Sequence, residues 1–371
     1  MKIIVLFVEV TEYNLALIEQ VYERLPQHWF TYVFCARSVT GHETARQLPE
    51  HATVLQGALR DRVRALSTVT TDLKADFAII NGYTGRVNAW LIQYCRRHGI
   101  PYAIESDTQL NIPANPVKRL FKQAYLHRIF QGNAYGFPGG TRQIELFRHY
   151  GMPEDRIFVM PMTVDTARFR EIAEQHSQEE YKETLGLSGH KVILYAGRFA
   201  PEKNLPCLLR AAALLRRSHE DFLLCLIGKG ESRPELERLA EELGLRDRVR
   251  FYEYQLMPRL AEFYSAADVF VLPSSFEPWG LVVNEALACR VPVIASDAVG
   301  CADDLIVPGE NGDVFPSGNP DALYLRLEKW MYEESACFRG VDVFQWNHDK
   351  YRAALTVALT VVERAKKSSD L

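Results

Sequence analysis

Two glutamates at a short spacing are the residues in this sequence best suited to chemistry. Glu277 follows the apolar run 269–273, and Glu285 comes after seven intervening residues, about one turn inside a helical segment. Carboxylates accept hydrogen bonds from hydroxyl groups. Two of them on either side of a turn can therefore grip the hydroxyls of two sugar rings.

The residues between the two acids predict an anion site. Gly280 permits a tight backbone, and the free amides of Leu281 and Val282 would face an anion with the positive end of the helix dipole behind them. We assign the remaining residues of the turn, Pro278 and Trp279, to the same site. Either acid alone fits an ordinary helix with an acidic first turn. The combination favours a ligand site in which the first acid holds a hexose and the second a ribose.

Two cations follow an earlier apolar run, 192–197, which ends in Gly197. Arg198 and Lys203 lie five residues apart just before a helical segment. Arginine binds phosphate oxygens as a fork and lysine as a point charge, so the pair suits a diphosphate and would offset the charge of a leaving group. Taken alone, the same turn also fits a solvated loop with charges at a helix start.

A third loop contains two glycines separated by one residue. The apolar run 222–228 ends in Gly228, and Lys229 and Gly230 follow it. Such a pair lets a backbone come close to a ligand before a helix starts. This glycine pair is informative because of its position. It follows a strand that we expect to neighbour the strand preceding Arg198. Tyr254 ends the next apolar run and is assigned to the neighbourhood of a nucleotide base.

The elements that must position these residues are strands and helices in alternation. Short apolar, β-branched runs alternate with segments of helical periodicity, which is typical of a parallel sheet covered by helices on both faces. The predicted strands are 3–10, 30–36, 77–81, 102–106 and 157–162 in the first half, and 192–197, 222–228, 249–254, 269–273 and 291–296 in the second. This pattern predicts an α/β protein with two doubly wound sheets, whose ligands bind at the carboxyl ends of the strands.

The domain organisation follows from the polar stretch between the two sets of strands. We expect an N-terminal, acceptor-side domain over 1–168, a C-terminal, donor-binding domain over 169–346 and a hinge near 166–180. The segment 347–371 reads as a helix that packs back toward the N-terminal domain. A chain of 371 residues is long enough for two such cores.

Composition excludes several classes. A net charge of −4 gives no overall positive field that would attract nucleic acid, which disfavours a nucleic-acid-binding protein. Seven scattered cysteines without a CxxC pair indicate reduced thiols in the cytoplasm and no metal or disulfide site. After Lys2 the N-terminus is apolar for only six residues before Glu9, which predicts a buried strand and no signal peptide. No GxGxxG follows that strand, which disfavours an NAD-dependent oxidoreductase.

The motifs together resemble the family 4 retaining glycosyltransferases of the GT-B fold, which have two Rossmann-like domains facing across a cleft. The resemblance rests on the two glutamates separated by seven residues, the Gly-Arg-x4-Lys turn at 197–203, the Gly-Lys-Gly-Glu segment 228–231 and the segments 285–297 and 308–312. It implies retaining, metal-independent transfer from a nucleotide-diphosphate sugar. Arg198 and Lys203 would stabilise the departing diphosphate, Gly280 to Val282 would cap the phosphates, and the two glutamates would hold hexose and ribose.

The sequence departs from this family at two positions. Arg290 stands where the family often has glycine after the helix, which would strain a left-handed cap and favours a different helix end. The glycine-rich loop after the first strand is absent, and Asn14 is expected there as a helix N-cap and acceptor-side residue. Asp107, in the loop after the run 102–106, is expected to contact the acceptor or the donor, although a turn cap is the alternative.

The segment 116–128 alternates cations with apolar residues at helical spacing. Two interpretations stay open: an interfacial helix on an anionic membrane, at the inner face, or an amphipathic helix packed on its own sheet with a wet basic face. We expect a UDP- or GDP-sugar donor and a glycan or lipid-linked acceptor, in cell-surface polysaccharide or glycolipid synthesis. Alternatives are a synthase, a phosphorylase-like enzyme or an epimerase of the same fold, an NAD-dependent oxidoreductase, or a sugar-binding protein without catalysis.

Overall fold

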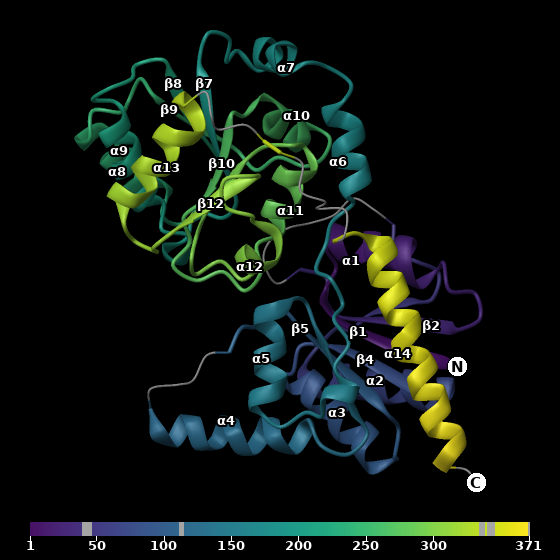
Figure 1. Ribbon diagram of the computed structural model, residues 1–371. Helices are drawn as coiled ribbons and strands as arrows, with labels where there is room; N and C mark the ends of the chain where they lie inside the picture. The colour runs from purple at the N-terminus through teal and green to yellow at the C-terminus, as the bar shows by residue number, and fades with distance from the viewer. Residues whose placement is uncertain (39–46, 111–114, 334–337, 340–345, 370–371) are drawn as a thin grey trace. The chain divides into compact units, whose positions relative to one another are not determined.

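The computed structural model describes residues 1–38, 47–110, 115–333, 338–339 and 346–369, and they form two compact units (Figure 1). Unit 1 comprises Met1–Met162 with Trp346–Leu371, and unit 2 comprises Thr163–Gln345. Each contains a parallel sheet of six strands, as the alternating pattern predicts. The chain crosses between the units at Met162, so the boundary expected at residue 168 falls inside helix α6 (Thr166–Ala173) of unit 2.

The sheet of unit 1 has the order β3-β2-β1-β4-β5-β6. Its strands are β1 (Lys2–Glu9), β2 (Trp29–Ala36), β3 (Ala52–Val54), β4 (Phe77–Asn81), β5 (Tyr102–Ser106) and β6 (Ala134–Pro138). The central strand β1 is apolar and buried from Ile3 to Phe7, where both of its faces are covered. Ile3, Val5 and Phe7 enter one core, and Ile4 and Leu6 enter the other.

Helices cover both faces of this sheet. They are α1 (Glu12–Leu17), the π-helix η1 (Ile18–Tyr22), α2 (Leu59–Leu73), α3 (Arg86–Arg97), α4 (Pro116–Ile129), α5 (Thr141–His149), the 3-10 helix η2 (Glu154–Arg156) and α14 (His348–Ser369). Tyr351, Leu355 and Leu359 of the C-terminal helix α14 lie in the core that Ile3 enters. The last helix of the chain is thus a structural part of the N-terminal unit.

Unit 2 repeats the plan with the strand order β12-β11-β10-β7-β8-β9. Its strands are β7 (Lys191–Ala196), β8 (Phe222–Ile227), β9 (Val249–Tyr252), β10 (Val269–Leu272), β11 (Val293–Ser296) and β12 (Gly312–Phe315). With α6, its helices are α7 (Gln178–Leu185), the 3-10 helix η3 (Pro201–Lys203), α8 (Leu205–Leu215), α9 (Arg233–Glu242), α10 (Arg259–Ala266), α11 (Leu281–Ala288), α12 (Ala302–Leu305) and α13 (Pro320–Tyr332). α8 packs against α13, and α10 packs against α6 and α7.

The prediction of a strand at 157–162 is wrong. Ile157 forms one isolated bridge with Gly136, and the amides of Phe158 and Met160 donate to carbonyls of β6 without extending the ladder. The strand at this edge of the sheet is β6 itself, which the sequence does not reveal because glycine and proline are depleted in strands. The short strands β3 and β12 were likewise not predicted.

Two helix ends also differ from expectation. Thr11 caps α1 by accepting from the amide of Asn14, whose own side chain donates to the carbonyl of Glu9 at 2.8 Å; Asn14 is therefore not the cap. After α11, Arg290 adopts the left-handed conformation with φ 62°. Its amide donates to Leu287 O, and the amide of Val291 donates to Ala286 O, which is a Schellman ending with arginine in the place of glycine.

The cysteines and the helix lengths complete the description of the fold. Six cysteines with free thiols lie in the described part of the chain, and Cys337 lies outside it. Among the helices that the described residues form, none combines the length and apolarity that a bilayer span requires.

Candidate functional site

The site that the motifs predicted lies within unit 2, at the carboxyl ends of β7, β8 and β10. The loop after β10 is anchored to η3, because the backbone amide of Ser275 donates to Glu202 O at 2.8 Å and the Ser275 hydroxyl donates to the same oxygen at 3.1 Å. These bonds bring together two segments that lie more than seventy residues apart in the sequence. These hydrogen bonds therefore join the two motifs into a single site.

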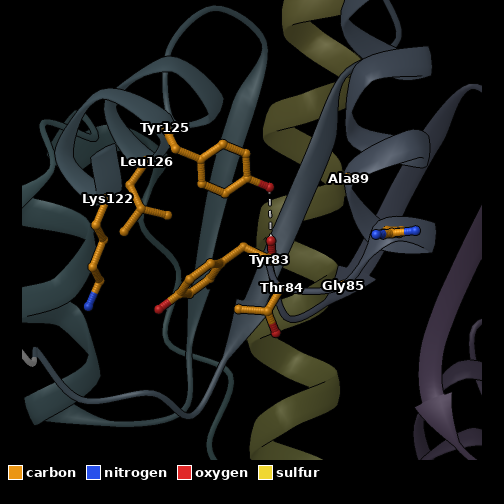
Figure 2. A pocket seen from close by; sticks show the side chains of 8 residues that line it. Tyr83, Thr84, Gly85, Ala89, Lys122, Tyr125 and Leu126 are labelled. Atoms are coloured by element: carbon orange, nitrogen blue, oxygen red, sulfur yellow. Dashed lines mark hydrogen bonds between the residues drawn. The ribbon is translucent and has the colours of Figure 1, made fainter. Parts of the chain in front are cut away.

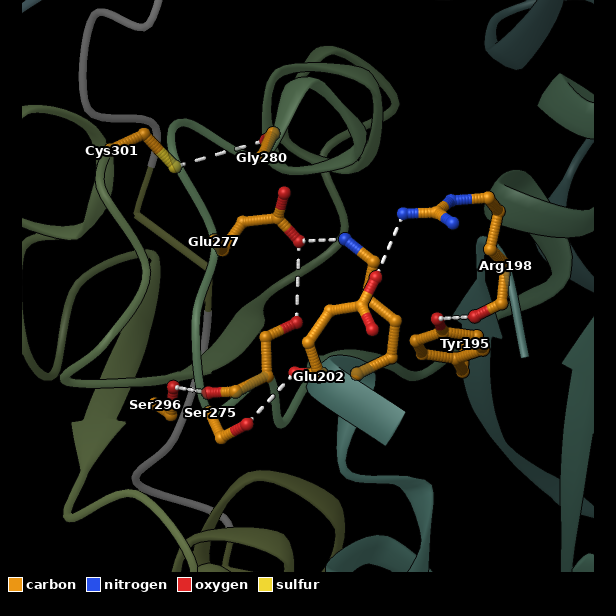
Figure 3. A network of polar contacts seen from close by, with 10 residues as sticks. Tyr195, Arg198, Glu202, Ser275, Glu277, Gly280, Ser296 and Cys301 are labelled. Carbon is orange, nitrogen blue, oxygen red and sulfur yellow. Dashed lines mark hydrogen bonds and ion pairs between the residues drawn. The ribbon is translucent and has the colours of Figure 1, made fainter. Parts of the chain in front are cut away.

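An ion pair joins Lys203 of η3 to Glu277 of the loop after β10. The Lys203 Nζ to Glu277 Oε2 distance is 2.5 Å, and the two side chains are only 14% and 12% exposed (Figure 3). The hydroxyl of Ser274 donates to the same carboxylate oxygen at 3.2 Å. Burial strengthens such a pair relative to one in open water. The carboxylate and the ammonium are thus held in place at the edge of the sheet.

Arg198 lies at the same edge, with its guanidinium turned to a different acid. Its side chain is 50% exposed and pairs with Glu202 Oε1 at 2.8 Å. Its carbonyl accepts a hydrogen bond from the hydroxyl of Tyr195 at 2.8 Å. The sequence did not single out Glu202, whose role is visible only in this pairing and in the anchoring of Ser275. The exposed guanidinium can turn toward an anion at little cost.

Gly280 opens helix α11 in a conformation that other residues rarely adopt. Its φ is 102°, and a Cβ there would lie 3.0 Å from Leu272 Cδ2 and 3.3 Å from Glu277 Cγ. The helix then begins at Leu281 with no side-chain cap on its first amides. Positive helix ends with free amides bind anions. The tight turn predicted from the sequence is confirmed.

The indole of Trp279 fixes this turn from inside. Its side chain is 1% exposed, and its Nε1 donates to Asn284 Oδ1 at 2.9 Å. The backbone is clipped to the segment after β11, since Gly300 N donates to Glu277 O and Cys301 N to Trp279 O, both at 3.0 Å. Trp279 was predicted to bind the donor, but its side chain lies in the core and supports the loop.

The two glycines after β8 are required by the packing of loops. A Cβ on Gly228 would lie 1.9 Å from Gly197 O, and one on Gly230 would lie 2.2 Å from Phe199 O. The loops after β7 and β8 are also hydrogen-bonded, because Phe199 N donates to Lys229 O at 2.9 Å. The glycines therefore position the loop that carries Arg198.

The comparison with known families shows what this unit is similar to. Residues 177–339, which include all six strands of unit 2, match the family described as "Glycosyl transferases group 1". The matched residues lie within unit 2 and make up less than half of the chain, so the match is a similarity of this unit to that family. The resemblance of unit 2, from here on the glycosyl transferase unit, to glycosyltransferases is confirmed, while family 4 and the retaining mechanism stay predictions.

Known proteins extend the comparison. The D-inositol 3-phosphate glycosyltransferase of Thermomonospora curvata is 37% identical over 188 residues, 47% of this chain and 43% of that protein. The alpha-D-kanosaminyltransferase of Streptomyces kanamyceticus is 32% identical over 172 residues, 46% of this chain and 44% of that protein. The chain thus spans less than half the length of these relatives. Similarity to both lies in about one half of the sequence.

The whole chain can be compared with a solved structure. The crystal structure of Anabaena Alr3699/HepE in complex with UDP superposes with a TM-score of 0.74 at 17% identity, covering 97% of this chain and 100% of that one. This likeness shows the fold, and with the two six-stranded sheets it confirms the GT-B architecture.

The second acid of the glycosyl transferase unit has an unusual proton affinity. Glu285 lies in α11, where burial raises the pKa of its carboxyl to about 7, and a hydrogen bond from the Tyr264 hydroxyl at 2.8 Å partly opposes that rise. Tyr264, on α10, is fully buried. Sequence reasoning missed it, because no motif links α10 to α11.

A pH dependence of donor binding follows. The resemblance assigns Glu285 to the ribose of the donor. If Glu285 binds the ribose, its carboxyl loses its charge below pH 7 and makes weaker hydrogen bonds to the ribose hydroxyls, so the donor KM should fall as the pH rises through about 7. In Tyr264→Phe the opposing hydrogen bond is lost, and the midpoint should move to higher pH. KM measured against pH in both proteins checks this. Tyr332→Phe, which loses a hydroxyl bond to Asp221 elsewhere, should keep the wild-type midpoint; equal midpoints in all three proteins would contradict the assignment.

The remaining predicted residues belong to other loops and helices. Tyr254 lies in the loop after β9, 41% exposed. Asp107 follows β5 in unit 1, and its carbonyl accepts from Gln143 Nε2 at 3.1 Å. Asn14 is buried in α1. Their ligand contacts stay predictions.

A carboxyl at the end of β5 was not singled out by the sequence. Glu105 is 3% exposed and accepts from the Tyr351 hydroxyl at 2.7 Å. Burial raises the pKa of this carboxyl above its ordinary value, although the bonds from Tyr351 and Asn81 oppose the rise. The bond crosses 246 positions of sequence, so no local pattern could reveal it. It ties α14 to the sheet of unit 1.

Proposed function

We propose that this protein is a retaining glycosyltransferase that moves a hexose from a UDP- or GDP-sugar to a glycan or lipid-linked acceptor, in cell-surface polysaccharide or glycolipid synthesis. The proposal is carried by the Lys203–Glu277 pair, which lies beside the uncapped start of α11 in the glycosyl transferase unit. Positive charge, free amides and a carboxylate at one sheet edge suit the two ends of a nucleotide-sugar diphosphate.

Each group has a separate task in this proposal. Lys203, Arg198 and the amides of Leu281 and Val282 bind the diphosphate and stabilise the charge that grows on it as the glycosidic bond breaks. The carboxylate of Glu277 accepts hydrogen bonds from hydroxyls of the donor sugar, and that of Glu285 accepts from the ribose. Because Lys203 and Glu277 are already paired, both are preorganised before the donor arrives.

The transfer retains the anomeric configuration because the acceptor attacks from the same face from which the leaving group departs. The acceptor oxygen forms a bond to the anomeric carbon as the bond to the phosphate oxygen breaks, and that phosphate oxygen takes the acceptor proton. No protein base is needed. No metal ion is needed either, since the two cations and the helix start supply the positive charge, and turnover should persist in EDTA. An NMR spectrum of the first-formed product, showing the donor's anomeric configuration, tests retention.

The names of similar proteins guide the choice of substrates. A structure of Anabaena Alr3699/HepE holds UDP, and the relatives are named as transferases acting with D-inositol 3-phosphate or a kanosamine sugar. UDP-sugars are accordingly the first donors to test. The first acceptors to test are phosphorylated and polyhydroxylated compounds. Asp107 and Asn14 are the expected acceptor contacts in unit 1.

Thermal denaturation with a panel of UDP-, GDP-, ADP- and TDP-sugars tests the proposed function. A ligand that binds only the folded state stabilises it by about 2.7 kcal/mol at about 100 times its Kd. At least one nucleotide-diphosphate sugar should raise the Tm, and the same compound should be consumed when an acceptor is added. A response to NAD together with none to any nucleotide-diphosphate sugar would overturn the proposal.

Helix α4 supports a peripheral membrane location at the inner face. Val117, Leu120 and Phe121 are 61%, 69% and 74% exposed, and the first turns of α4 extend past the sheet of unit 1 (Figure 1). The alternative, in which the apolar residues of this helix pack on their own sheet, holds only for its end, where Leu126 and Ile129 are buried. Exposed lysines and arginines beside the apolar side chains complement an anionic surface.

Vesicle flotation tests this location. The protein should float with anionic vesicles at low salt and less with zwitterionic ones, because about 1 kcal/mol per cation comes from the anionic surface. A Leu120→Ser, Phe121→Ser variant should lose binding. The matched control is Leu325→Ser, since Leu325 is 57% exposed on α13 of unit 2 and should leave flotation unchanged. Absence of flotation with anionic vesicles at low salt would remove the membrane location.

A further inference from the structure

The two cations assigned to the diphosphate have different acidic partners. Lys203 pairs with Glu277, which is itself assigned to the donor sugar. The Arg198 guanidinium instead donates to Glu202 Oε1 at 2.8 Å, an acid that the proposed function leaves without a task (Figure 3). A diphosphate that approaches Arg198 therefore meets a cation to which a carboxylate is already bound. Because the two anions repel each other, the carboxylate competes with the diphosphate.

The backbone on both sides of this ion pair is fixed. The carbonyl of Arg198 accepts a hydrogen bond from the hydroxyl of the buried Tyr195 at 2.8 Å. The carbonyl of Glu202 accepts two bonds from Ser275, one from its amide at 2.8 Å and one from its hydroxyl at 3.1 Å. These contacts use only the main chain of Arg198 and Glu202, so they persist when the two side chains separate. The pair can thus open by side-chain rotation while the turn 198–203 stays in place.

Exposure distinguishes this pair from that of Lys203 and Glu277. The Arg198 and Glu202 side chains are 50% and 37% exposed, whereas those of Lys203 and Glu277 are 14% and 12% exposed. An exposed pair opens at a small cost in free energy, because water solvates both charges after they separate. Separating a buried pair leaves charges without compensation. Arg198 is therefore the cation of this site that can exchange one anion for another.

We propose that Glu202 holds Arg198 in the empty site and competes with the donor diphosphate for it. When the diphosphate binds, the guanidinium leaves the Glu202 carboxylate and takes phosphate oxygens, for which its fork is suited. When the nucleoside diphosphate departs after transfer, the carboxylate takes the guanidinium back. Glu202 accordingly lowers the affinity of the site in proportion to the fraction of Arg198 that it holds, and favours release of the product. The inference rests on the proposed function, because that function supplies the diphosphate as the ligand of Arg198.

Titration calorimetry of the full chain with UDP, and with GDP in parallel, tests this role in Glu202→Gln. Glutamine keeps the shape of the side chain and the backbone carbonyl that Ser275 contacts, but it removes the charge that holds Arg198. The variant should bind the nucleoside diphosphate about fivefold more tightly than the wild type, since an exposed ion pair can withhold about that factor in affinity. Unchanged or weaker binding would overturn the proposal, and so would an equal gain for uridine, which has no phosphate.

A double-mutant cycle separates the ion pair from the general effect of one negative charge. In the Arg198→Ala background, Glu202→Gln has no guanidinium to release and should change the affinity for UDP or GDP by less than about twofold. The same gain in both backgrounds would show that Glu202 acts only as a nearby charge, and this result would overturn the proposal.

The matched acid control is Glu242→Gln. Glu242 forms another ion pair at the same sequence spacing in unit 2, with Arg238 on α9 at 3.3 Å, and both of its side chains are exposed. Glu242→Gln removes the same charge as Glu202→Gln and should bind UDP like the wild type. An equal gain in the two variants would contradict the specific role of Glu202.

The control for Arg198→Ala is Lys122→Ala, which also removes one cation. Lys122 belongs to α4 of unit 1, where it lines a cavity with Tyr125 and Leu126 (Figure 2). Lys122→Ala should bind UDP like the wild type, whereas Arg198→Ala should bind it more weakly because the diphosphate loses a charge-assisted contact. Equal losses in the two variants would contradict the contact between Arg198 and the diphosphate.

The wild-type titration distinguishes the two possible failures. If the wild type binds neither UDP nor GDP, the proposed function fails and this inference fails with it. If the wild type binds one of them and Glu202→Gln shows no gain in affinity, this inference alone is overturned.

Discussion

Glu277→Gln should lower kcat by about 10²–10³, the loss typical of removing one preorganised polar contact to a transition state. Glutamine keeps the shape of the side chain but cannot balance the charge of Lys203, which now lies 2.5 Å from the carboxylate oxygen. The hydroxyls of the donor sugar would lose a charged acceptor as the bond breaks. Steady-state kinetics with the donor found in the thermal panel checks this value.

A matched control separates catalysis from stability. Lys182 and Asp268 form another buried pair in unit 2, with Nζ and Oδ2 3.0 Å apart and side chains 6% and 19% exposed. Asp268 lies before β10, at the end of the sheet opposite Glu277. Asp268→Asn should lower the Tm and leave kcat nearly unchanged, whereas Glu277→Gln should stay folded and lose turnover. Wild-type kcat in Glu277→Gln would contradict its role.

Lys203→Met should weaken both the binding of the nucleoside diphosphate and the transfer step. Methionine retains most of the aliphatic length but removes the charge that offsets the leaving diphosphate, so kcat should fall by about 10²–10³. Affinity for the nucleoside diphosphate should fall more than affinity for the monophosphate, because the terminal phosphate is the group assigned to Lys203. Calorimetry with both nucleotides measures the difference.

The control for this variant is Lys191→Met. Lys191 stands at the opposite end of β7, where its ammonium lies 5.1 Å from the centroid of the Tyr332 ring. Lys191→Met removes one positive charge from unit 2 and should change neither nucleotide affinity nor kcat. If Lys203→Met and Lys191→Met lost the same affinity, general charge and not a specific contact would explain binding.

The alternation of apolar runs and helical segments was sufficient to predict two parallel sheets, because buried parallel strands need apolar residues on both faces. It failed at β6, where Gly136 and Pro138 lie inside a strand, and at β3, which has only three residues. The segment 157–162 has the composition of a strand, but it pairs with β6 through isolated contacts. Composition alone does not distinguish these cases.

The candidate site was predictable where its motifs are local. The turn at Gly280 and the start of α11 lie within one short segment, and their geometry follows from glycine and helix physics. The pairing of Lys203 with Glu277 was not predictable, since the contact spans 74 positions. The buried indole of Trp279 and the bond from Tyr264 to Glu285 likewise depend on tertiary packing.

The exposure of α4 shows the same limit. Its sequence fits a packed helix and an interfacial helix equally well, because both need apolar residues at helical spacing. Only the structure shows that Leu120 and Phe121 have no core to enter in unit 1, while Leu126 does.

A crystal structure with the bound nucleoside diphosphate that gives the largest thermal shift is the most direct test of the central claim. The account predicts a diphosphate within hydrogen-bond distance of Lys203 Nζ and of the amides of Leu281 and Val282, with the ribose at Glu285. A nucleotide bound elsewhere on unit 2, with Lys203 and Glu277 still paired to each other alone, would contradict it.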